Sequence, residues 1–382
     1  MLRFALYLAA TWGTLLALTV GLPGWAVLAV ATVALYTLLP IALFVRWRGW
    51  PFYPSAAFRL LVVRPALYAQ LLLPLGAAGG LLGLLVGAFF GEALLVGRAV
   101  AGAVLAVGSL ILVAGYLGSR SLRVRETEAQ VRDLPAELDG LRIVQISDVH
   151  VGPHTSSRFL ERVVRAVETL RPDLVAVTGD LVDDRHEDVA AYARVLGRLR
   201  APAGVFLIPG NHDVYAGWDH VERGLRRLTD ATILVNEARV LERGGARFAV
   251  VGVGDPAGRD GAAAPDVERA LARVPAGVPV IAFAHNPVLW PRLARRGVAL
   301  TLSGHTHWGQ LALPRLGWSL ASPFLEHAMG AHRDGDALLF IHPGTGYWGI
   351  PFRLGALPEV TAVVLRAATT TAMVVGERRC AA

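Results

Sequence analysis

The sequence predicts an α/β domain that follows a helical membrane region. The chain has 382 residues, of which 54% are hydrophobic and only 18% charged, and its mean hydropathy is +0.48. This composition is too apolar for a disordered chain and high for a soluble enzyme. The apolar residues concentrate before residue 118, whereas strand-like and helix-like runs alternate from Arg120 onward, as in α/β proteins. We therefore expect a membrane region and an α/β domain of about 230 residues, a length that can bury a substantial core.

Four stretches of the first part contain no charged residue and are close to the roughly 20 residues that a membrane-spanning helix needs. They are Phe4–Val20, Trp25–Val45, Leu67–Phe90 and Ala99–Leu117. Core helices of a soluble protein are the alternative, but such helices seldom lack a polar face over this length. The first stretch could also be a signal peptide that begins at Arg3, although the three later stretches favour a retained helix. We predict about four transmembrane helices in residues 1–118.

The arginines indicate how these helices are oriented, because the chain contains no lysine and carries a formal net charge of +7. They precede the first stretch, separate the second from the third, and follow the fourth: Arg3; Arg46, Arg48, Arg59 and Arg64; Arg120, Arg123 and Arg125. Positive residues favour the cytoplasmic side. The pattern predicts an integral membrane protein with its C-terminal domain in the cytoplasm. The segment Trp47–Pro65, with Trp50, Phe52 and Tyr53, fits a membrane interface or an ordinary loop equally well.

Residues 119–140 are charged and read as a linker, and strands and helices are expected after them. The expected strands are Leu141–Ile146, Leu174–Val177, Val205–Ile208, Ala231–Val240, Ala246–Val253, Val278–Ala284, Ala299–Leu302, Ala337–Ile341 and Val360–Leu365. The expected helices are Ser156–Leu170, Val189–Leu199 and Trp218–Leu228. Such alternation implies sheets that are covered by helices.

Polar side chains follow five of these strands, and ligands of α/β folds bind beyond the carboxyl ends of strands. The five clusters are Asp148 and His150; Asp180, Asp183 and Asp184; Asn211, His212 and Asp213; His285; and His305 and His307. The one cysteine, Cys380, excludes a cysteine-based metal site, so any metal is bound by His, Asp, Glu or Asn. Asp183 and Asp184 could instead cap a helix or be solvated. The other six histidines are expected to be structural, with His154 and His342 nearest to the clusters.

The ordered set D-x-H, G-D-x-x-D, G-N-H-D, a lone His and G-H-x-H resembles the calcineurin-like metallophosphoesterase family, in particular its bacterial membrane-associated branch. The resemblance covers residues Leu141 to Leu365 and says nothing about residues 1–118. Trp308 departs from that branch, whose last motif usually reads G-H-T-H-G-G-Q. The resemblance implies a two-sheet sandwich flanked by helices (αββα) over residues 141–368, with a C-terminal tail at 369–382.

The resemblance also implies two divalent metal ions and a role for each motif residue. Asp148, His150, Asp180 and His307 would bind one ion, and Asp180, Asn211, His285 and His305 the other, so that Asp180 bridges them. His212 would protonate the leaving oxygen, and Asp183 would orient the His212 side chain. Asn211 and Trp308 would contact the substrate. Mixed nitrogen and oxygen ligands suit Mn²⁺, Fe or Zn²⁺.

The implied reaction is hydrolysis of a phosphate ester by a hydroxide that bridges the two ions. Because the membrane helices hold the site near the bilayer, we expect an amphiphilic, lipid-linked phosphodiester or pyrophosphate. A tethered phosphodiesterase or phosphatase for a soluble substrate is an alternative, and a non-catalytic membrane sensor or scaffold is another. No nucleic acid is expected, because no basic stripe with interleaved aromatic residues is present. The segment Trp308–Met329 could line an acyl groove or form core, and the sequence does not determine the oligomeric state.

Overall fold

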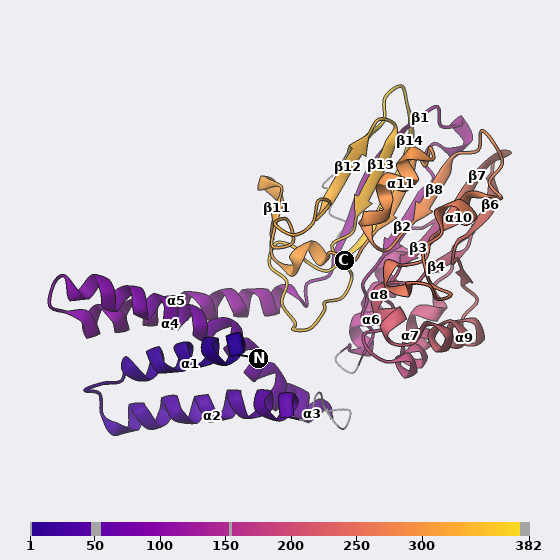
Figure 1. Ribbon diagram of the computed structural model, residues 1–382. Coiled ribbons are helices and arrows are strands. Elements are labelled where there is room, and N and C mark those ends of the chain that lie inside the picture. Colours follow the sequence, from indigo (N-terminus) through magenta and orange to yellow (C-terminus); the bar gives the residue numbers. More distant parts are fainter. Residues whose placement is uncertain (1, 47–54, 153–154, 375–382) are drawn as a thin grey trace. The chain divides into compact units, whose positions relative to one another are not determined.

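The computed structural model describes residues 2–46, 55–152 and 155–374 (Figure 1). The chain divides into two compact units, Met1–Gly115 and Tyr116–Ala382. Several residues named above lie outside the described ranges: Arg48, Trp50, Phe52, Tyr53, His154 and Cys380. Each unit is described by itself below.

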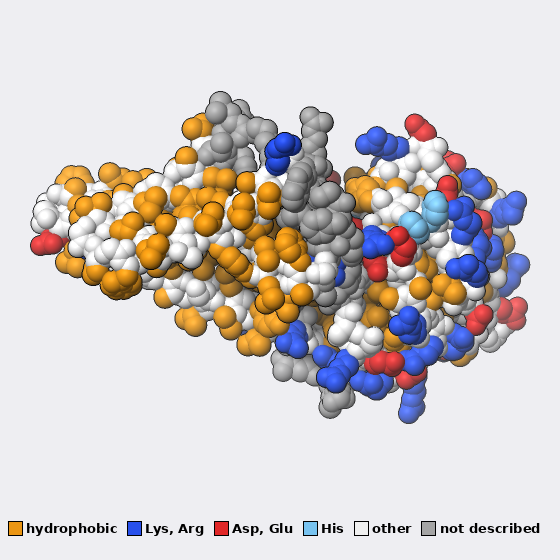
Figure 2. Space-filling model, turned by 90° about the horizontal axis from the view of Figure 1, so that it is seen from below, with side chains coloured by type: hydrophobic (Ala, Val, Ile, Leu, Met, Phe, Trp, Pro, Cys, Tyr) orange, Lys and Arg blue, Asp and Glu red, His pale blue; other side chains and the backbone are white. Residues whose placement is uncertain are grey.

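The N-terminal unit is a set of apolar helices. They are α1 (Leu2–Ala17), α2 (Gly24–Arg46), the short α3 (Ala56–Phe58), which a π-helical turn (Arg59–Val63) joins to α4 (Arg64–Ala88), and α5 (Ala93–Gly118), whose last residues belong to the second unit. Within the described ranges, three helical stretches are long and apolar enough to cross a membrane: Gly24–Leu43, Arg59–Ala88 and Ala93–Gly118. The apolar part of α1, Leu6–Ala17, is shorter than expected. Hydrophobic side chains dominate the surface of these helices in Figure 2.

Small residues let α4 and α5 pack closely. A Cβ atom built on Gly83 would lie 2.8 Å from the Cα atom of Gly97, and one built on Gly76 would lie 2.7 Å from Cγ of Leu105. Such close backbone approach is typical of helix packing in membranes. The glycines therefore serve the packing of helices within this unit.

The second unit contains a seven-stranded sheet in the order β15-β1-β14-β2-β3-β4-β5. Its strands are β1 (Arg123–Arg132), β2 (Arg142–Ile146), β3 (Leu174–Thr178), β4 (Val205–Ile208), β5 (Thr232–Ile233), β14 (Glu359–Ala368) and β15 (Ala372–Val374). Strands β2 to β5 are parallel to one another, and β14 is antiparallel to β2. The carboxyl ends of β2, β3 and β4 therefore meet at one edge of this sheet.

A six-stranded sheet has the order β12-β13-β9-β8-β7-β6. Its strands are β6 (Glu237–Arg243), β7 (Ala246–Gly252), β8 (Val280–Phe283), β9 (Leu300–Ser303), β12 (Gly330–Asp334) and β13 (Ala337–Ile341). Strands β7, β8, β9 and β13 are parallel, whereas β6 and β12 are antiparallel edge strands. A small hairpin of β10 (Ala312–Leu313) and β11 (Trp318–Ser319) lies outside both sheets.

The two sheets pack face to face with helices on their outer faces. Side chains of both sheets, such as Ile143, Phe206, Ile281 and Phe340, form one buried cluster between them. Helices α6 (Ser157–Thr169), α7 (Val189–Val195) and α9 (Trp218–Leu228) cover the first sheet, and α10 (Val267–Leu271) and α11 (Trp290–Arg295) cover the second. Helix α8 (Asn211–Tyr215) follows β4. This is the expected αββα sandwich.

Two expectations about the boundaries of the elements need correction. The predicted linker at 119–140 contains β1, which pairs with β14 along its whole length, and the predicted tail contains β15, which pairs with β1. Thr127, Ala129 and Val131 alternate inward on β1, while the polar residues between them, Glu128 and Gln130, point outward. The predicted strand Ala231–Val240 is in fact two strands, because β5 joins the first sheet and β6 the second.

Candidate metal centre

Five strand ends bring the predicted residues to one place. Strands β2, β3 and β4 end just before Asp148, Asp180 and Asn211, and β8 and β9 end just before His285 and His305. The two sheets present these ends at the same side of the sandwich, so residues separated by more than 150 positions come within contact distance. The predicted convergence at the carboxyl ends of the strands is therefore present in the structure.

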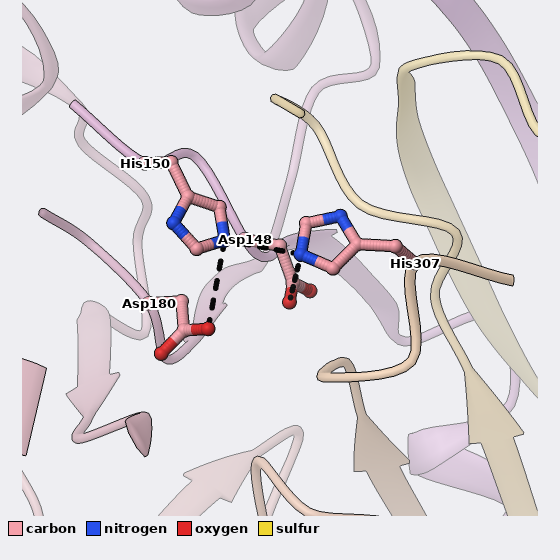
Figure 3. Close-up of side chains that lie close together, drawn as sticks. All are labelled: Asp148, His150, Asp180 and His307. Carbon is pink, nitrogen blue, oxygen red and sulfur yellow. Dashed lines mark hydrogen bonds and ion pairs between the residues drawn. The ribbon is translucent and has the colours of Figure 1, made fainter. Parts of the chain in front are cut away.

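Asp148, His150, Asp180 and His307 form a first cluster (Figure 3). All four are buried. His150 Nε2 lies 3.0 Å from His307 Nε2 and 3.6 Å from Asp180 Oδ2, and His307 Nε2 lies 3.3 Å from Asp148 Oδ1. Two imidazole nitrogens and two carboxylates that face one another at these distances are a ligand set for a divalent transition metal ion.

Asn211, His285 and His305 form a second cluster on the other side of Asp180. His285 Nε2 lies 3.2 Å from Asp180 Oδ2 and 3.2 Å from Asn211 Oδ1, and His305 Nδ1 lies 2.8 Å from Asn211 Oδ1. The same Asp180 oxygen thus faces both clusters. This arrangement fits a dinuclear metal site in which one carboxylate serves both ions.

Neighbouring groups orient the imidazoles. His285 Nδ1 donates a hydrogen bond to the Thr178 carbonyl at 2.7 Å, so Nε2 is the ring nitrogen that faces Asp180. Such an outer contact usually fixes the tautomer of a metal-binding histidine. His307 differs, because the Arg353 guanidinium donates to its Nδ1 at 2.7 Å and so places the ring proton on Nε2.

The backbone at these ligands is not extended. Asp148, His150, Asp180, His305 and His307 all have φ between 47° and 69°, in the left-handed region that residues other than glycine seldom adopt. The side chains of Asp148 and His150 nevertheless reach the same cluster. Backbone strain of this kind concentrates at functional sites.

Glycines allow the loops to approach each other closely. Gly179 has a φ of 90°, and a Cβ atom built on it would lie 2.6 Å from Nδ1 of His285 and 2.9 Å from Cα of Gly210. A Cβ atom on Gly304 would overlap the side chains of Ser147 and Asp148. A side chain at either position would displace a predicted ligand.

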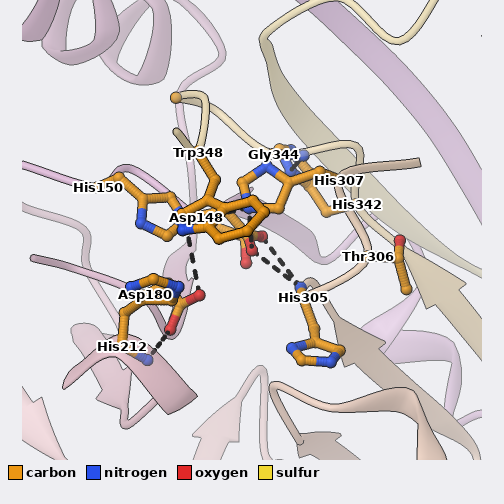
Figure 4. A network of polar contacts seen from close by, with 12 residues as sticks. Asp148, His150, Asp180, His212, His305, Thr306, His307, His342, Gly344 and Trp348 are labelled. Atoms are coloured by element: carbon orange, nitrogen blue, oxygen red, sulfur yellow. Dashed lines mark hydrogen bonds and ion pairs between the residues drawn. The ribbon is translucent and has the colours of Figure 1, made fainter. Parts of the chain in front are cut away.

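His212 lies beside the two clusters and is partly exposed (Figure 4). Its Nδ1 donates to the backbone carbonyl of Asp183 at 2.9 Å, while its Nδ1 and the Asp183 carboxylate oxygen are 3.9 Å apart. That carboxylate is nearer to His150, with Oδ1 3.3 Å from His150 Nδ1. The backbone carbonyl of Asp183 therefore orients His212, and the carboxylate of Asp183 instead contacts His150 of the first cluster.

Asp213 ties two of the loops together. Its carboxylate accepts hydrogen bonds from the backbone N–H groups of Leu181, Val182 and Gly210 at 2.9–3.1 Å. Its side chain is fully buried, and burial, followed by the charge of Asp180, raises the pKa of Asp213 to about 7. Asp213 thus holds the loop that carries Asp180 against the loop that carries Asn211.

The electrostatics of the site favour bound cations. Burial raises the pKa of Asp148, and the attraction of His285 keeps the pKa of Asp180 below its usual value against the cost of its own burial. Burial lowers the pKa of His305 to about 4, and burial and then Arg353 hold the pKa of His307 well below its usual range. Burial opposes a charge on His285 and His150, but the neighbouring carboxylates outweigh it and raise the pKa of both, that of His285 well above its usual value. Metal binding at these two rings would therefore release protons.

Sequence reasoning missed Arg353 as a member of the site. The side chain is completely buried and donates to the carbonyls of His307, Pro343 and Gly346. Its only signal in the sequence is its place in the C-terminal segment Gly349-Ile-Pro351-Phe-Arg353. His342 is also buried and accepts a hydrogen bond from the N–H of Gly344, so it is a core residue near the site.

The tryptophan beside the site is not the one expected from the sequence. Trp308 is 4% exposed, packs with Trp290 and Leu339, and donates from Nε1 to the Ile341 carbonyl, so it lies in the core and forms no wall of the cleft. Trp348 is the tryptophan beside the site, because its ring centroid is 6.0 Å from that of His212 and its backbone bonds to Gln310 (Figure 4).

Comparison with known proteins identifies the class to which this site belongs. Residues 141–309 match the family model described as calcineurin-like phosphoesterase. An uncharacterized metallophosphoesterase of Bacillus subtilis, YkuE, is 30% identical over 271 residues, which cover 69% of this chain and 93% of that protein. The chain therefore belongs to the calcineurin-like phosphoesterase family.

The name of another relative describes it as a transmembrane protein. A transmembrane protein with metallophosphoesterase domain from Danio rerio is 34% identical over 278 residues, which cover 70% of this chain. The match spans 61% of that protein, so the chain covers about six tenths of such a relative. Among solved structures, a dimetal phosphatase from Danio rerio aligns over 54% of this chain and 88% of its own, with 14% identity and a TM-score of 0.34.

Proposed function

We propose that the protein is a membrane-anchored phosphoesterase that uses two divalent metal ions. The observation that carries this proposal is the position of Asp180, whose Oδ2 lies 3.6 Å from His150 Nε2 of one cluster and 3.2 Å from His285 Nε2 of the other. Mn²⁺, Fe and Zn²⁺ suit these ligands. Bound there, two such ions would neutralise the phosphate and supply an activated water.

The residues of the chain then have separate tasks. Asp148, His150 and His307 hold one ion, Asn211, His285 and His305 hold the other, and Asp180 holds both. His212 stands beside them with Nδ1 bonded to the Asp183 carbonyl, so its Nε2 can donate a proton to the leaving oxygen when the ring is protonated. The amide of Asn211 can also contact the substrate phosphate.

We propose a lipid-linked phosphodiester or pyrophosphate as the substrate, hydrolysed at the cytoplasmic face of a bacterial inner membrane. The apolar helices support it, because they keep the site near the surface where such substrates concentrate. The arginines between and after the helices support the orientation. Reporter fusions after residue 374 test the orientation, since a reporter active only outside the cell would overturn it.

Hydrolysis by the full chain tests the proposal. The purified protein in nanodiscs is stripped with a chelator, supplied with Mn²⁺, and assayed on an aryl phosphomonoester, an aryl phosphodiester and a lipid pyrophosphate. We expect metal-dependent hydrolysis, fastest on the lipid substrate. Preference for a soluble ester would favour the tethered phosphodiesterase alternative, and inactivity with every metal that binds would indicate a sensor or scaffold.

The role of His212 has its own test. We expect His212→Ala to keep its metal and to lose about 10²–10⁴-fold in kcat, the usual contribution of general acid catalysis. Metal content is measured alongside kcat, and His220→Ala, which alters a histidine of α9 outside the clusters, is the control. Full activity of the His212 variant would refute the role.

A further inference from the structure

The segment between the last metal motif and β12 exposes a concentration of apolar side chains. We call residues 313–325, which include the β10–β11 turn and the loop after it, the apolar hairpin. Leu316 is 75% exposed and Phe324 80% exposed. The hairpin also exposes Leu313, Trp318, Leu320 and Leu325. Of the longer segment Trp308–Met329, Trp308, Ala312 and Ala328 are buried and belong to the core, whereas the apolar side chains of the hairpin are not.

Exposed large apolar side chains are scattered over the rest of the described domain. From Arg120 onward, the other exposed large apolar side chains among the described residues are Tyr215, Leu228, Val240, Val288 and Trp348, which come from separate elements. The hairpin itself contains one charged residue, Arg315. Contiguous exposed apolar patches mark sites of contact with a protein or a membrane.

The hairpin is tied to the end of the domain at which the chain arrives from the apolar helices. Four residues, 119–122, join the end of α5 to the start of β1, and they span at most about 14 Å. Arg123 of β1 donates its backbone N–H to Pro358, and Leu354, four residues earlier, accepts from the N–H of Ala312 at the base of the hairpin. The start of β1 and the hairpin are therefore linked through one short segment.

We propose that the apolar hairpin enters the lipid leaflet of the membrane that the helices of the chain cross. The mixture of leucines with Trp318, Phe324 and one arginine is typical of segments that lie in a membrane interface. Figure 1 shows β11 standing out from the domain beyond β12, and it pairs only with β10, outside both large sheets of the described residues. The position near the start of β1 favours the lipid over a separate protein, because the bilayer is already at that end of the chain.

Insertion would set the depth of the metal centre. His307 lies six residues before the hairpin, and Gln310, next to its base, bonds to Trp348 beside His212. A hairpin held in the leaflet would therefore hold the site at the level of the lipid head groups, where a lipid-linked phosphate lies. The inference rests on the anchoring part of the proposed function and is independent of its chemistry.

Site-directed fluorescence on the full chain tests the inference. In a Cys380→Ser background, single cysteines are placed at Leu316 or Phe324, at Val240 on the edge strand β6 as a control, and at Leu110 of α5 as a membrane reference. Each is labelled with bimane, and the protein is incorporated in nanodiscs of phosphatidylcholine and phosphatidylglycerol. Quenching is measured with a nitroxide-labelled lipid and with aqueous iodide.

We expect the labels at positions 316 and 324 to lose most of their fluorescence with the nitroxide lipid and little with iodide, and the label at 240 to show the reverse. Iodide quenching at 316 and 324 equal to that at 240 would overturn the inference. Protection from both quenchers would also overturn it, because it would mean that protein covers the hairpin. If the label at 110 responds to the lipid and those at 316 and 324 do not, only this inference fails; if 110 does not respond, the anchoring fails with it.

Discussion

A methyl group added at Gly179 should disable the second metal cluster. Its Cβ would lie 2.6 Å from Nδ1 of His285, whereas ordinary contact begins at 3.4 Å, so the ring would have to move by the difference, 0.8 Å. The ring cannot move freely, because Nδ1 is bonded to the Thr178 carbonyl at 2.7 Å. We expect overpacking to cost about 1–3 kcal/mol of folding free energy. A displacement of this size near the reacting groups can lower activity about 10²-fold.

Gly245→Ala is the matched control for Gly179→Ala. Gly245 has a φ of 89°, close to the 90° of Gly179, but nothing lies within 4 Å of its Cβ position. Both variants carry the backbone cost of a left-handed alanine, about 1–2 kcal/mol, and only Gly179→Ala carries the clash. Metal content, thermal unfolding and diester hydrolysis are measured for both. Equal metal content and equal activity in the two variants would refute the assignment of His285 as a ligand held by this contact.

Three further outcomes follow from the site. Asp180→Asn should lower the content of both metals, as measured by mass spectrometry, and an unchanged content would count against the shared carboxylate. Arg353→Met leaves several buried carbonyls without a donor, which should lower the free energy of unfolding by about 1–3 kcal/mol for each carbonyl. The control Arg239→Met removes an exposed ion pair worth about 1 kcal/mol or less. Equal melting temperatures of the two variants would contradict the role of Arg353. Burial lowers the pKa of His342 from 6.5 to about 3, so between pH 6.5 and pH 3 this histidine binds a proton in the unfolded chain but not in the folded one. As the pH drops through this range, the free energy of unfolding should decrease by up to about 1.4 kcal/mol per pH unit from this group. The decrease should be smaller in His342→Asn.

Much of the domain could be predicted because its strands are short apolar runs with polar residues directly behind them. Strand β4 has the predicted bounds Val205–Ile208, and helix α9 has the predicted bounds Trp218–Leu228. Strand β1 was not predictable in this way, because it contains five charged residues and only Thr127, Ala129 and Val131 are buried. The change of sheet between β5 and β6 was also hidden, since an apolar run carries no information about which sheet it joins.

The site was predictable as a set of residues but not as a geometry. The order of the motifs brings the ligand residues together, yet it does not reveal the left-handed backbone at Asp148 and His150. The contact between the Asp183 carboxylate and His150 depends on how two loops meet. Trp308 shows the limit most clearly, because burial of a tryptophan at a motif position depends on neighbours from β13 and α11 that are distant in the sequence.

The position of β1 decides where the domain can be cut from its anchor. Because β1 lies between β14 and β15, a fragment that begins after residue 132 would lack an interior strand, expose the hydrogen-bonding edge of β14 and leave β15 without its neighbour. Removal of the apolar helices therefore has to stop before Arg123, because after a cut between β1 and β2 the domain is still held to the helices through the paired strand β1.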